Sequence, residues 1–184
     1  MVKILGISGS LRKASLNSKL LHQAQQLMPE GSSLEAMTLH GIPLYDGDVE
    51  EADGSPVAVE ALKAAIRGAD GVLLVTPEYN NGIPGVFKNA IDWASRPPKD
   101  SPGVFRDRPF ALIGASPGGF GTILSQDAWL PVLRTLETRF WAGGRLMLSR
   151  AHQAFDENGA LTDEQTREML RKFLAGYVDF IKKG

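Results

Sequence analysis

Short apolar runs alternate along the chain with longer stretches in which apolar residues recur every three or four positions. Runs of the first kind predict buried strands, and the helical spacing of the second kind predicts amphipathic helices. The expected strands cover residues 2–8, 33–39, 70–76, 108–116 and 144–149, and the expected helices cover residues 16–28, 57–69, 84–95, 122–140 and 162–182.

Local signals place the starts of several of these helices. Ser55 and Pro56 suit the N-cap and first position of the second helix, and Pro84 begins the third. Thr162 with Gln165 fits a capping box at the start of the last helix. Pro131 should kink the fourth helix or fall at a helix start.

The order of these elements predicts the fold. Most of the strands are continuous apolar runs, with residues 33–39 a weaker candidate, and helices separate them, which is typical of a parallel sheet covered on both faces. Five strand–helix units in 184 residues fit an α/β, flavodoxin-like doubly wound five-stranded parallel sheet of order 2-1-3-4-5, with helices on both faces. A six-stranded Rossmann sheet fits less well. We expect a single domain over residues 1–184, because this length suffices for one sizeable core and is short for two.

Composition narrows the classes of function. A formal net charge of -1 gives no electrostatic reason to bind nucleic acid or an anionic membrane. The chain has no cysteine, which excludes disulfides, thiolate metal sites and a cysteine nucleophile. His22, His40 and His152 are far apart and show no ligand spacing, so we expect no metal site. No run is long enough to span a bilayer and the N-terminus is no signal peptide, so we expect a cytoplasmic protein without membrane insertion.

The loop after the first strand, SGSLRKASLN, offers groups that bind phosphate. In a doubly wound sheet, ligands bind at the carboxyl ends of the strands near the switch point, which here lies between strands 1 and 3. The loop runs into a helix N-terminus and carries hydroxyl and amide groups from Ser10, Ser15 and Asn17. Arg12 adds a guanidinium group, which can donate two hydrogen bonds to one phosphate. The alternative is an ordinary serine-capped helix start. Neither the dinucleotide fingerprint nor the Walker P-loop pattern is present.

The loop after the third strand, TPEYNNGIPG, places unusually polar residues at the end of an apolar strand. Tyr79 offers an aromatic face, while Glu78, Asn80 and Asn81 offer hydrogen-bonding groups, with Gly82 giving the turn its freedom. This combination suits a planar heterocycle. The alternative is a polar turn whose groups find partners within the protein.

Two further loops complete this edge of the sheet. After the fourth strand, SPGGFGT carries three glycines that let the main chain approach a flat ligand, and Phe120 could cover it. Alone this is a weak signal, but the three loops together fall on the strand ends that the topology selects. The segment HGIPLYDGDVEE after the second strand is expected to be a flexible surface loop, in which Leu44 or Tyr45 could touch substrate.

The stretches GSLRKASLN and PEYNNGIPGVFKNAIDW together closely resemble the NADPH-dependent FMN reductase family of flavodoxin-like flavoproteins, whose branch includes quinone, chromate and some azo reductases. The resemblance implies non-covalent FMN, NAD(P)H as co-substrate, and homodimers or homotetramers. It places Ser10, Arg12, Ser15 and Asn17, with Leu16 beside them, at the phosphate. It places Pro77, Glu78, Tyr79 and Asn80 along the isoalloxazine ring, with Ser116, Gly118 and Gly119 closing its other side.

These expectations define an FMN-dependent NAD(P)H oxidoreductase that reduces quinones or similar acceptors, such as chromate, azo compounds or free flavin. Because FMN carries the chemistry, no catalytic acid, base or nucleophile is required, and Tyr79 would form a wall for stacking substrates. Nicotinamide and acceptor would use one open flavin face in turn. A flavodoxin-type electron carrier and a phosphate-binding module without redox activity are the alternatives; the small net charge disfavours the carrier.

Two further features concern ion pairing and self-association. Lys88 and Asp92 are spaced as a surface or interface ion pair on one helix. A large apolar set follows in the fourth helix and either packs in the core or forms a self-association surface. This set comprises Trp129, Leu130, Leu133, Leu136, Phe140 and Trp141.

Overall fold

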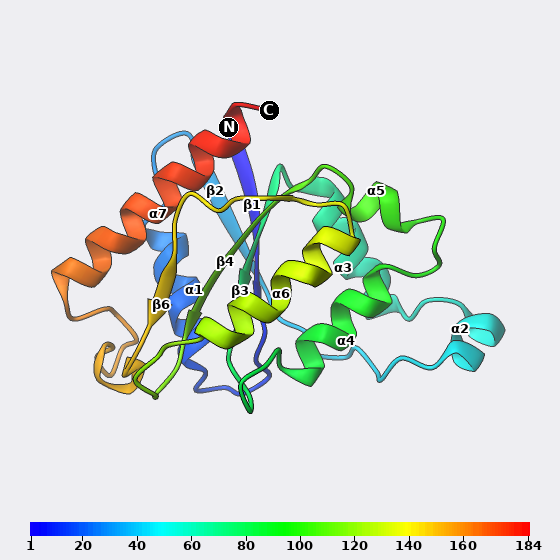
Figure 1. Cartoon of the computed structure of the whole chain (residues 1–184), viewed down its shortest axis with the longest axis horizontal. Helices are drawn as coiled ribbons and strands as arrows, with labels where there is room; N and C mark the ends of the chain where they lie inside the picture. The colour runs from blue at the N-terminus through cyan, green and yellow to red at the C-terminus, as the bar shows by residue number, and fades with distance from the viewer.

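The computed structural model describes residues 1–184 and contains one parallel sheet. Its order is β2-β1-β3-β4-β5, with β6 also paired to β4, which confirms the predicted flavodoxin-like fold (Figure 1). All the paired strands run parallel. The strands are β1 (Val2–Ser8), β2 (Ser32–Met37), β3 (Gly71–Val75), β4 (Pro109–Ala115), β5 (Arg139–Phe140) and β6 (Leu146–Leu148).

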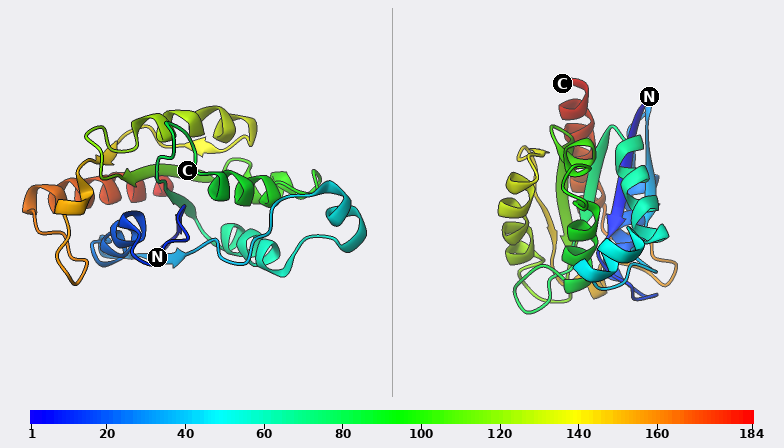
Figure 2. Two further views of the ribbon diagram at one scale, coloured as in Figure 1. Left: turned by 90° about the horizontal axis from the view of Figure 1, so that it is seen from below. Right: turned by 90° about the vertical axis from the view of Figure 1, so that its right-hand side faces the viewer.

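Helices cover both faces of this sheet, as predicted (Figure 2). The residues of α1 and α7 pack in one core cluster, and those of α3, α4, α5 and α6 pack in the other. None of the helices combines the length and apolar character needed to cross a membrane. The helices are α1 (Leu16–Gln26), α2 (Gly47–Asp53), α3 (Val57–Gly68), α4 (Gly85–Ala94), α5 (Ser101–Phe105), α6 (Ile123–Thr135) and α7 (Glu164–Lys182).

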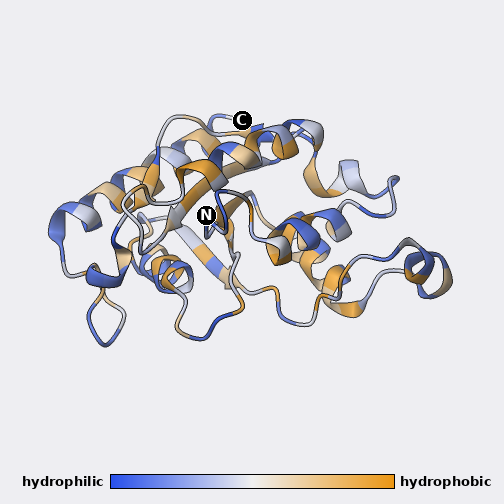
Figure 3. Ribbon diagram, turned by 60° about the horizontal axis from the view of Figure 1, so that its bottom comes forward, coloured by the Kyte–Doolittle hydropathy of each residue, from blue (hydrophilic) through white to orange (hydrophobic).

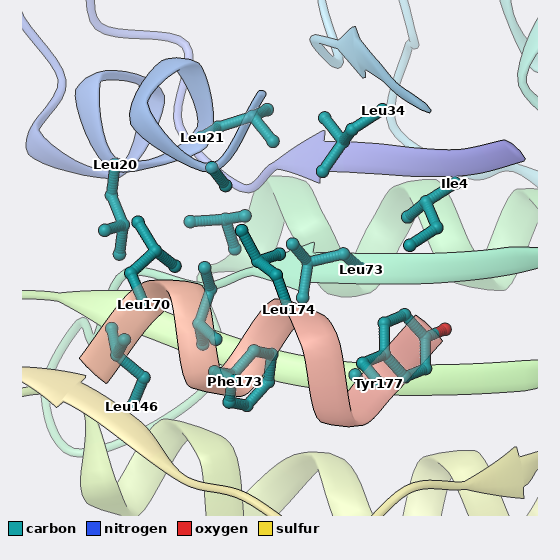
Figure 4. Packing of buried hydrophobic residues seen from close by; sticks show 14 of the residues in the cluster. Ile4, Leu20, Leu21, Leu34, Leu73, Leu146, Leu170, Phe173, Leu174 and Tyr177 are labelled. Carbon is teal, nitrogen blue, oxygen red and sulfur yellow. The ribbon is translucent and has the colours of Figure 1, made fainter. Parts of the chain in front are cut away.

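The strands β3 and β4 are buried at every position because each one contributes side chains to both cores. In β3, Leu73 and Val75 face the α1–α7 cluster, whereas Val72 and Leu74 face the opposite cluster. This two-residue alternation is the ordinary geometry of a strand. Figure 4 shows part of the α1–α7 core, in which leucines of α1 and α7 pack together on one face of the sheet. Figure 3 shows hydrophobic and hydrophilic residues alternating along the helices, as expected for helices that pack one side on the sheet.

The predicted strand at residues 144–149 is present as β6, but a second short strand, β5, precedes it within residues that were predicted to be helical. The chain pairs with β4 first at β5 and again at β6. Between the two strands, the main-chain N–H of Trp141 donates to Phe110 O at 2.8 Å. The indole of Trp141 packs edge-on against Phe173 of α7, with ring centroids 4.8 Å apart, and lies 5.6 Å from Tyr177. The prediction that residues 122–140 form one helix was therefore wrong, since α6 ends at Thr135 and residues 139–140 join the sheet.

Several predicted helix starts also differ. Asp163, rather than Thr162, caps α7, and its carboxylate accepts from the N–H and the hydroxyl of Thr166 at 2.7 and 2.6 Å. Pro56 occupies the N-cap position of α3 and Ser55 makes no cap bond. Pro131 lies inside α6.

The segment after β2 lies on the surface, as predicted, but it contains the helix α2, which was not predicted. Figure 1 shows α2 projecting from the body of the protein, and none of its residues is buried. Polar bonds anchor the segment to α4: the side chain of Asn89 accepts from Tyr45 N–H at 2.9 Å and donates to Pro43 O at 2.8 Å. The hydrogen bond from Arg96 holds the pKa of Glu50 below its usual value. The sequence pattern did not indicate these bonds, because Asn89 and its partners are more than forty residues apart in sequence.

Candidate functional site

The loops that follow β1, β3 and β4 come together at one edge of the sheet, the lower edge in Figure 1. Both chain termini lie at the opposite edge in the same view. The convergence follows from the parallel order β1-β3-β4, because parallel strands deliver their carboxyl ends to one edge. This edge is therefore the candidate site that the sequence predicts.

The loop between β1 and α1 leaves many hydrogen-bond donors free. Ser15 is the N-cap of α1, and its hydroxyl accepts from Ser18 N–H at 3.2 Å. Arg12 is exposed and forms no ion pair within the chain. Such free donors at a helix N-terminus fit an anion. The main-chain N–H groups that donate to no protein atom are those of Ser10, Leu11, Lys13, Ala14, Leu16 and Asn17.

Two buried contacts fix the position of this loop. The side-chain amide of Asn17 donates to Ala115 O at 2.8 Å and accepts from Ala115 N–H at 2.9 Å. Through these two bonds the side-chain amide of Asn17 joins α1 to the end of β4. Because Asn17 is only 3% exposed and its amide is used in this way, its main-chain N–H is the group left for a ligand. Gly9 permits the close packing, since a Cβ there would lie 2.1 Å from the ring of Phe87.

The loop after β3 begins with a tight hairpin. The N–H of Tyr79 donates to Gly82 O at 3.2 Å, and the N–H of Gly82 donates to Tyr79 O at 3.1 Å. Between them, Asn80 and Asn81 have φ of 50° and 63°, as a type I′ turn requires. Gly82 has no left-handed φ, so the prediction that it gives the turn its freedom was wrong. Tyr79 is 51% exposed beside this turn.

Glu78 is engaged by the protein itself. Its carboxylate accepts from the N–H groups of Leu124 and Ser125, at 2.9 and 3.0 Å, at the start of α6. Below it, the hydroxyl of Thr76 is fully buried and lies 2.9 Å from that of Ser125. Sequence reasoning missed these contacts, because α6 begins more than forty residues after Glu78.

The loop after β4 is held at its base and open at its tip. Ser116 donates through its hydroxyl to Gly121 O at 2.6 Å, and Gly118 O accepts from Arg150 N–H at 2.9 Å. A Cβ on Gly119 would meet no atom within 4 Å, and one on Gly118 would meet only the Ser116 hydroxyl, at 3.7 Å. Neither glycine has a left-handed φ. Packing and conformation therefore do not require glycine here, whereas the close approach of a flat ligand would.

Other predicted side chains lie as follows. Lys88 and Asp92 form the expected ion pair, with Nζ and Oδ1 2.6 Å apart. Phe120 is 86% exposed and covers nothing within the chain. His40, which sequence reasoning gave no role, donates through Nε2 to Leu11 O at 3.1 Å and so contacts the first loop.

The sheet order and the three converging loops define the class: a flavodoxin-like α/β protein with its candidate ligand site at the carboxyl edge of β1, β3 and β4. Residues 2–153 match the sequence profile of the NADPH-dependent FMN reductase family. The chain belongs to this family, which confirms the resemblance carried by the two sequence motifs.

Similar proteins match almost the whole chain. An NAD(P)H-dependent FMN reductase of Pseudomonas aeruginosa is 46% identical over 173 residues, covering 94% of this chain and 91% of the relative. A 2-hydroxy-1,4-benzoquinone reductase of a Burkholderia species is 36% identical and covers 98% of this chain and 97% of its own. Among solved structures, FerB of Paracoccus denitrificans, a flavoenzyme NAD(P)H:(acceptor) oxidoreductase, superposes with a TM-score of 0.87 at 37% identity, covering 100% of this chain and 98% of its own.

Proposed function

We propose that the protein is an FMN-dependent oxidoreductase that transfers two electrons from NAD(P)H to quinones or similar small acceptors. The observation that carries the proposal is the β1–α1 loop, whose unbonded N–H groups and exposed Arg12 lie at the same sheet edge as the two ring loops. Membership of the FMN reductase family and the quinone reductase named among the relatives support this assignment.

The proposed phosphate site consists of this loop and the N-terminus of α1. The residues that would hold the phosphate are Ser10, Arg12, Ser15, Leu16 and Asn17. The free N–H groups of Leu16 and Asn17 lie in the first turn of α1, where the helix dipole also favours an anion. Arg12 would add a charge-assisted contact. The side chain of Asn17 would contribute indirectly, since its amide is bonded to Ala115.

The proposed ring site lies between the β3 and β4 loops. Pro77, Glu78 and Asn80 would approach the ring from one loop, with the Glu78 contribution coming from its main chain. Ser116, Gly118 and Gly119 would approach it from the other loop. The open space above Gly118 and Gly119 supports this placement, since a Cβ there would occupy it.

Bound FMN would supply the redox chemistry, accepting hydride from NAD(P)H and passing two electrons to the acceptor. The chain would hold the ring and leave one of its faces open. Half-exposed Tyr79 would form a wall against which nicotinamide and acceptor stack in turn. We expect parallel double-reciprocal lines in steady-state kinetics, and intersecting lines would contradict a shared face.

Anaerobic reduction tests the activity directly. The apoprotein is titrated with FMN, and the loaded protein is then mixed with NADPH or NADH without oxygen while the visible flavin absorbance is followed. We expect bleaching by nicotinamide and recovery when a quinone is added. Stable yellow colour without bleaching would indicate an electron carrier, and failure to take up FMN would reject both functions.

We also propose that the protein forms homodimers or homotetramers through the outer surface of α6. Trp129 is fully buried and Trp141 packs on α7, so neither tryptophan provides this surface. Ile123, Leu124 and Leu130 are 40–45% exposed instead, and they line a hollow of about 380 Å³ between α6 and β6. Asp127 and Arg145 also line it and form no ion pair within the chain, so a second copy related by a twofold axis could pair them reciprocally.

A further inference from the structure

The start of α6 depends on a carboxylate from another loop. The N-cap residue of this helix, Thr122, makes no side-chain cap bond, and its hydroxyl accepts instead from Gln126 at 3.0 Å. The first-turn N–H groups of Leu124 and Ser125 donate to Glu78, which is 46 and 47 residues earlier in the chain. Glu78 therefore does what an N-cap side chain does elsewhere, but it does so from the loop after β3.

A second set of hydrogen bonds, centred on the buried hydroxyl of Thr76, also connects the end of β3 to α6. The hydroxyl of Thr76 donates to Pro77 O at 2.9 Å and accepts from the indole N–H of Trp129 at 3.1 Å. The only hydroxyl proton of Thr76 is therefore used in the bond to Pro77 O. The hydroxyl of Ser125, whose oxygen lies 2.9 Å from that of Thr76, must then be the donor between the two hydroxyls. Ser125 consequently contacts the β3 loop twice: its N–H binds Glu78 and its hydroxyl binds Thr76.

The backbone beside these hydrogen bonds is too close to the neighbouring strand to tolerate a side chain. A Cβ on Gly114 of β4 would lie 2.0 Å from Thr122 Oγ1 and 2.3 Å from Thr76 O. The end of β3, the end of β4 and the start of α6 are therefore in direct contact. Thr76, Thr122 and Ser125 are fully buried in this arrangement, whereas Glu78 is only partly buried.

We propose that Glu78 is a positioning residue that locks the loop after β3 to the start of α6 and so sets the width of the space in which the flavin ring would lie. The proposal rests on the assignment of FMN to this edge. Glu78 leads into the Tyr79–Gly82 hairpin on one side of that space, and α6 follows directly from the Gly118–Gly121 loop on its other side. Its carboxylate does not contact the reacting atoms; it acts through the two loops.

Removal of this contact is expected to weaken FMN binding without abolishing folding. Without the carboxylate, the two loops sample several separations, and only the fraction with the correct width binds the ring. If that fraction falls to about one tenth, the Kd for FMN rises about tenfold, which corresponds to about 1.4 kcal/mol. Glu78→Gln should stay close to wild type, since its amide oxygen can still accept both N–H bonds.

The experiment compares FMN dissociation constants of Glu78→Ala, Glu78→Gln and a matched control, together with amide hydrogen exchange of Leu124 and Ser125 in the apoprotein. Asp163→Ala is the control, because Asp163 caps α7 in the same way but bonds only to Thr166. We expect faster exchange and about tenfold weaker FMN binding for Glu78→Ala, near-complete rescue by Glu78→Gln, and unchanged FMN affinity for Asp163→Ala despite a similar loss of thermal stability.

The possible results separate this proposal from the proposed function. If the wild type binds FMN and Glu78→Ala binds it equally well, Glu78 is only a helix cap and the positioning role is overturned. If the wild type binds no FMN, the proposed function fails and the positioning role fails with it. If amide hydrogen exchange at Leu124 and Ser125 is the same in Glu78→Ala as in the wild type, only the positioning role of Glu78 is rejected. If Glu78→Ala does not fold, Glu78→Asp is used in its place. The aspartate side chain is one methylene shorter and cannot reach both N–H groups. Wild-type FMN affinity of this variant would also overturn the proposal.

Discussion

At the scale of single residues, the polar side chains at the candidate site mostly bind the protein itself. The amide of Asn17 is bonded to Ala115 and the carboxylate of Glu78 to α6. What the site leaves free is main-chain N–H groups, the guanidinium of Arg12 and the half-exposed ring of Tyr79. The residue types suggested ligand contacts, whereas the structure uses most of their side chains to hold the loops in place.

Arg12 offers the sharpest test at this scale. Arg12→Ala should weaken FMN binding by about 1.5–3 kcal/mol, because it removes a charge-assisted contact to the phosphate. Arg12→Lys should recover part of the loss, since an ammonium keeps the charge but not the planar fork. Isothermal titration of the apoproteins with FMN measures both effects.

The control for this test is Arg134→Ala, which removes an exposed arginine from the last turn of α6. It should leave FMN affinity unchanged. Wild-type affinity in Arg12→Ala would show that the phosphate loop is wrongly assigned.

At the scale of elements, contacts between segments far apart in sequence hold the edge of the sheet together. Asn17 joins α1 to β4 across 98 residues, and Asn89 joins α4 to the segment before α2. The helix and strand patterns correctly predicted most of these elements. They did not predict which side chains connect them, because periodicity describes the face an element buries and not its partner.

Asn17 tests this connection between elements. Asn17→Ala should lower the free energy of unfolding by about 2–6 kcal/mol, since it leaves both the N–H and the carbonyl of buried Ala115 without a partner, at about 1–3 kcal/mol each. Denaturant unfolding of the apoprotein measures the loss.

Asn158→Ala is the matched control, because Asn158 is exposed and its side chain forms no hydrogen bond. It should change stability by less than about 0.5 kcal/mol. Equal stability of Asn17→Ala and the wild type would mean that water replaces both bonds at no cost.

At the scale of the whole molecule, the apolar residues of the Trp129–Trp141 region divide between two cores and one surface. Trp129 packs edge-on against Phe87 of α4, while Trp141 crosses to the α7 face. Leu130 stays exposed on α6. The sequence pattern left core packing and self-association as alternatives because it cannot show that the chain leaves the helix at Thr135 and joins the sheet.

A charge exchange tests the proposed α6 contact between copies. Asp127→Arg should shift the protein toward monomers, since it places like charges opposite Arg145 of the second copy. Combining it with Arg145→Asp should restore the assembly, because the exchanged charges attract again. Analytical ultracentrifugation of the three proteins measures the effect, and a double variant no more associated than Asp127→Arg would contradict this interface.

The sequence by itself determined the sheet, its order and the edge at which a ligand site would form. Continuous apolar strands separated by amphipathic helices allow few other arrangements, and the polar loops after β1, β3 and β4 had to meet because parallel strands end together. Only the tertiary structure decided how that edge is held: Glu78 caps a helix that begins 45 residues later, and Asn17 satisfies the end of β4. Such bonds depend on distances between loops, and those distances exist only once the sheet has brought the loops together.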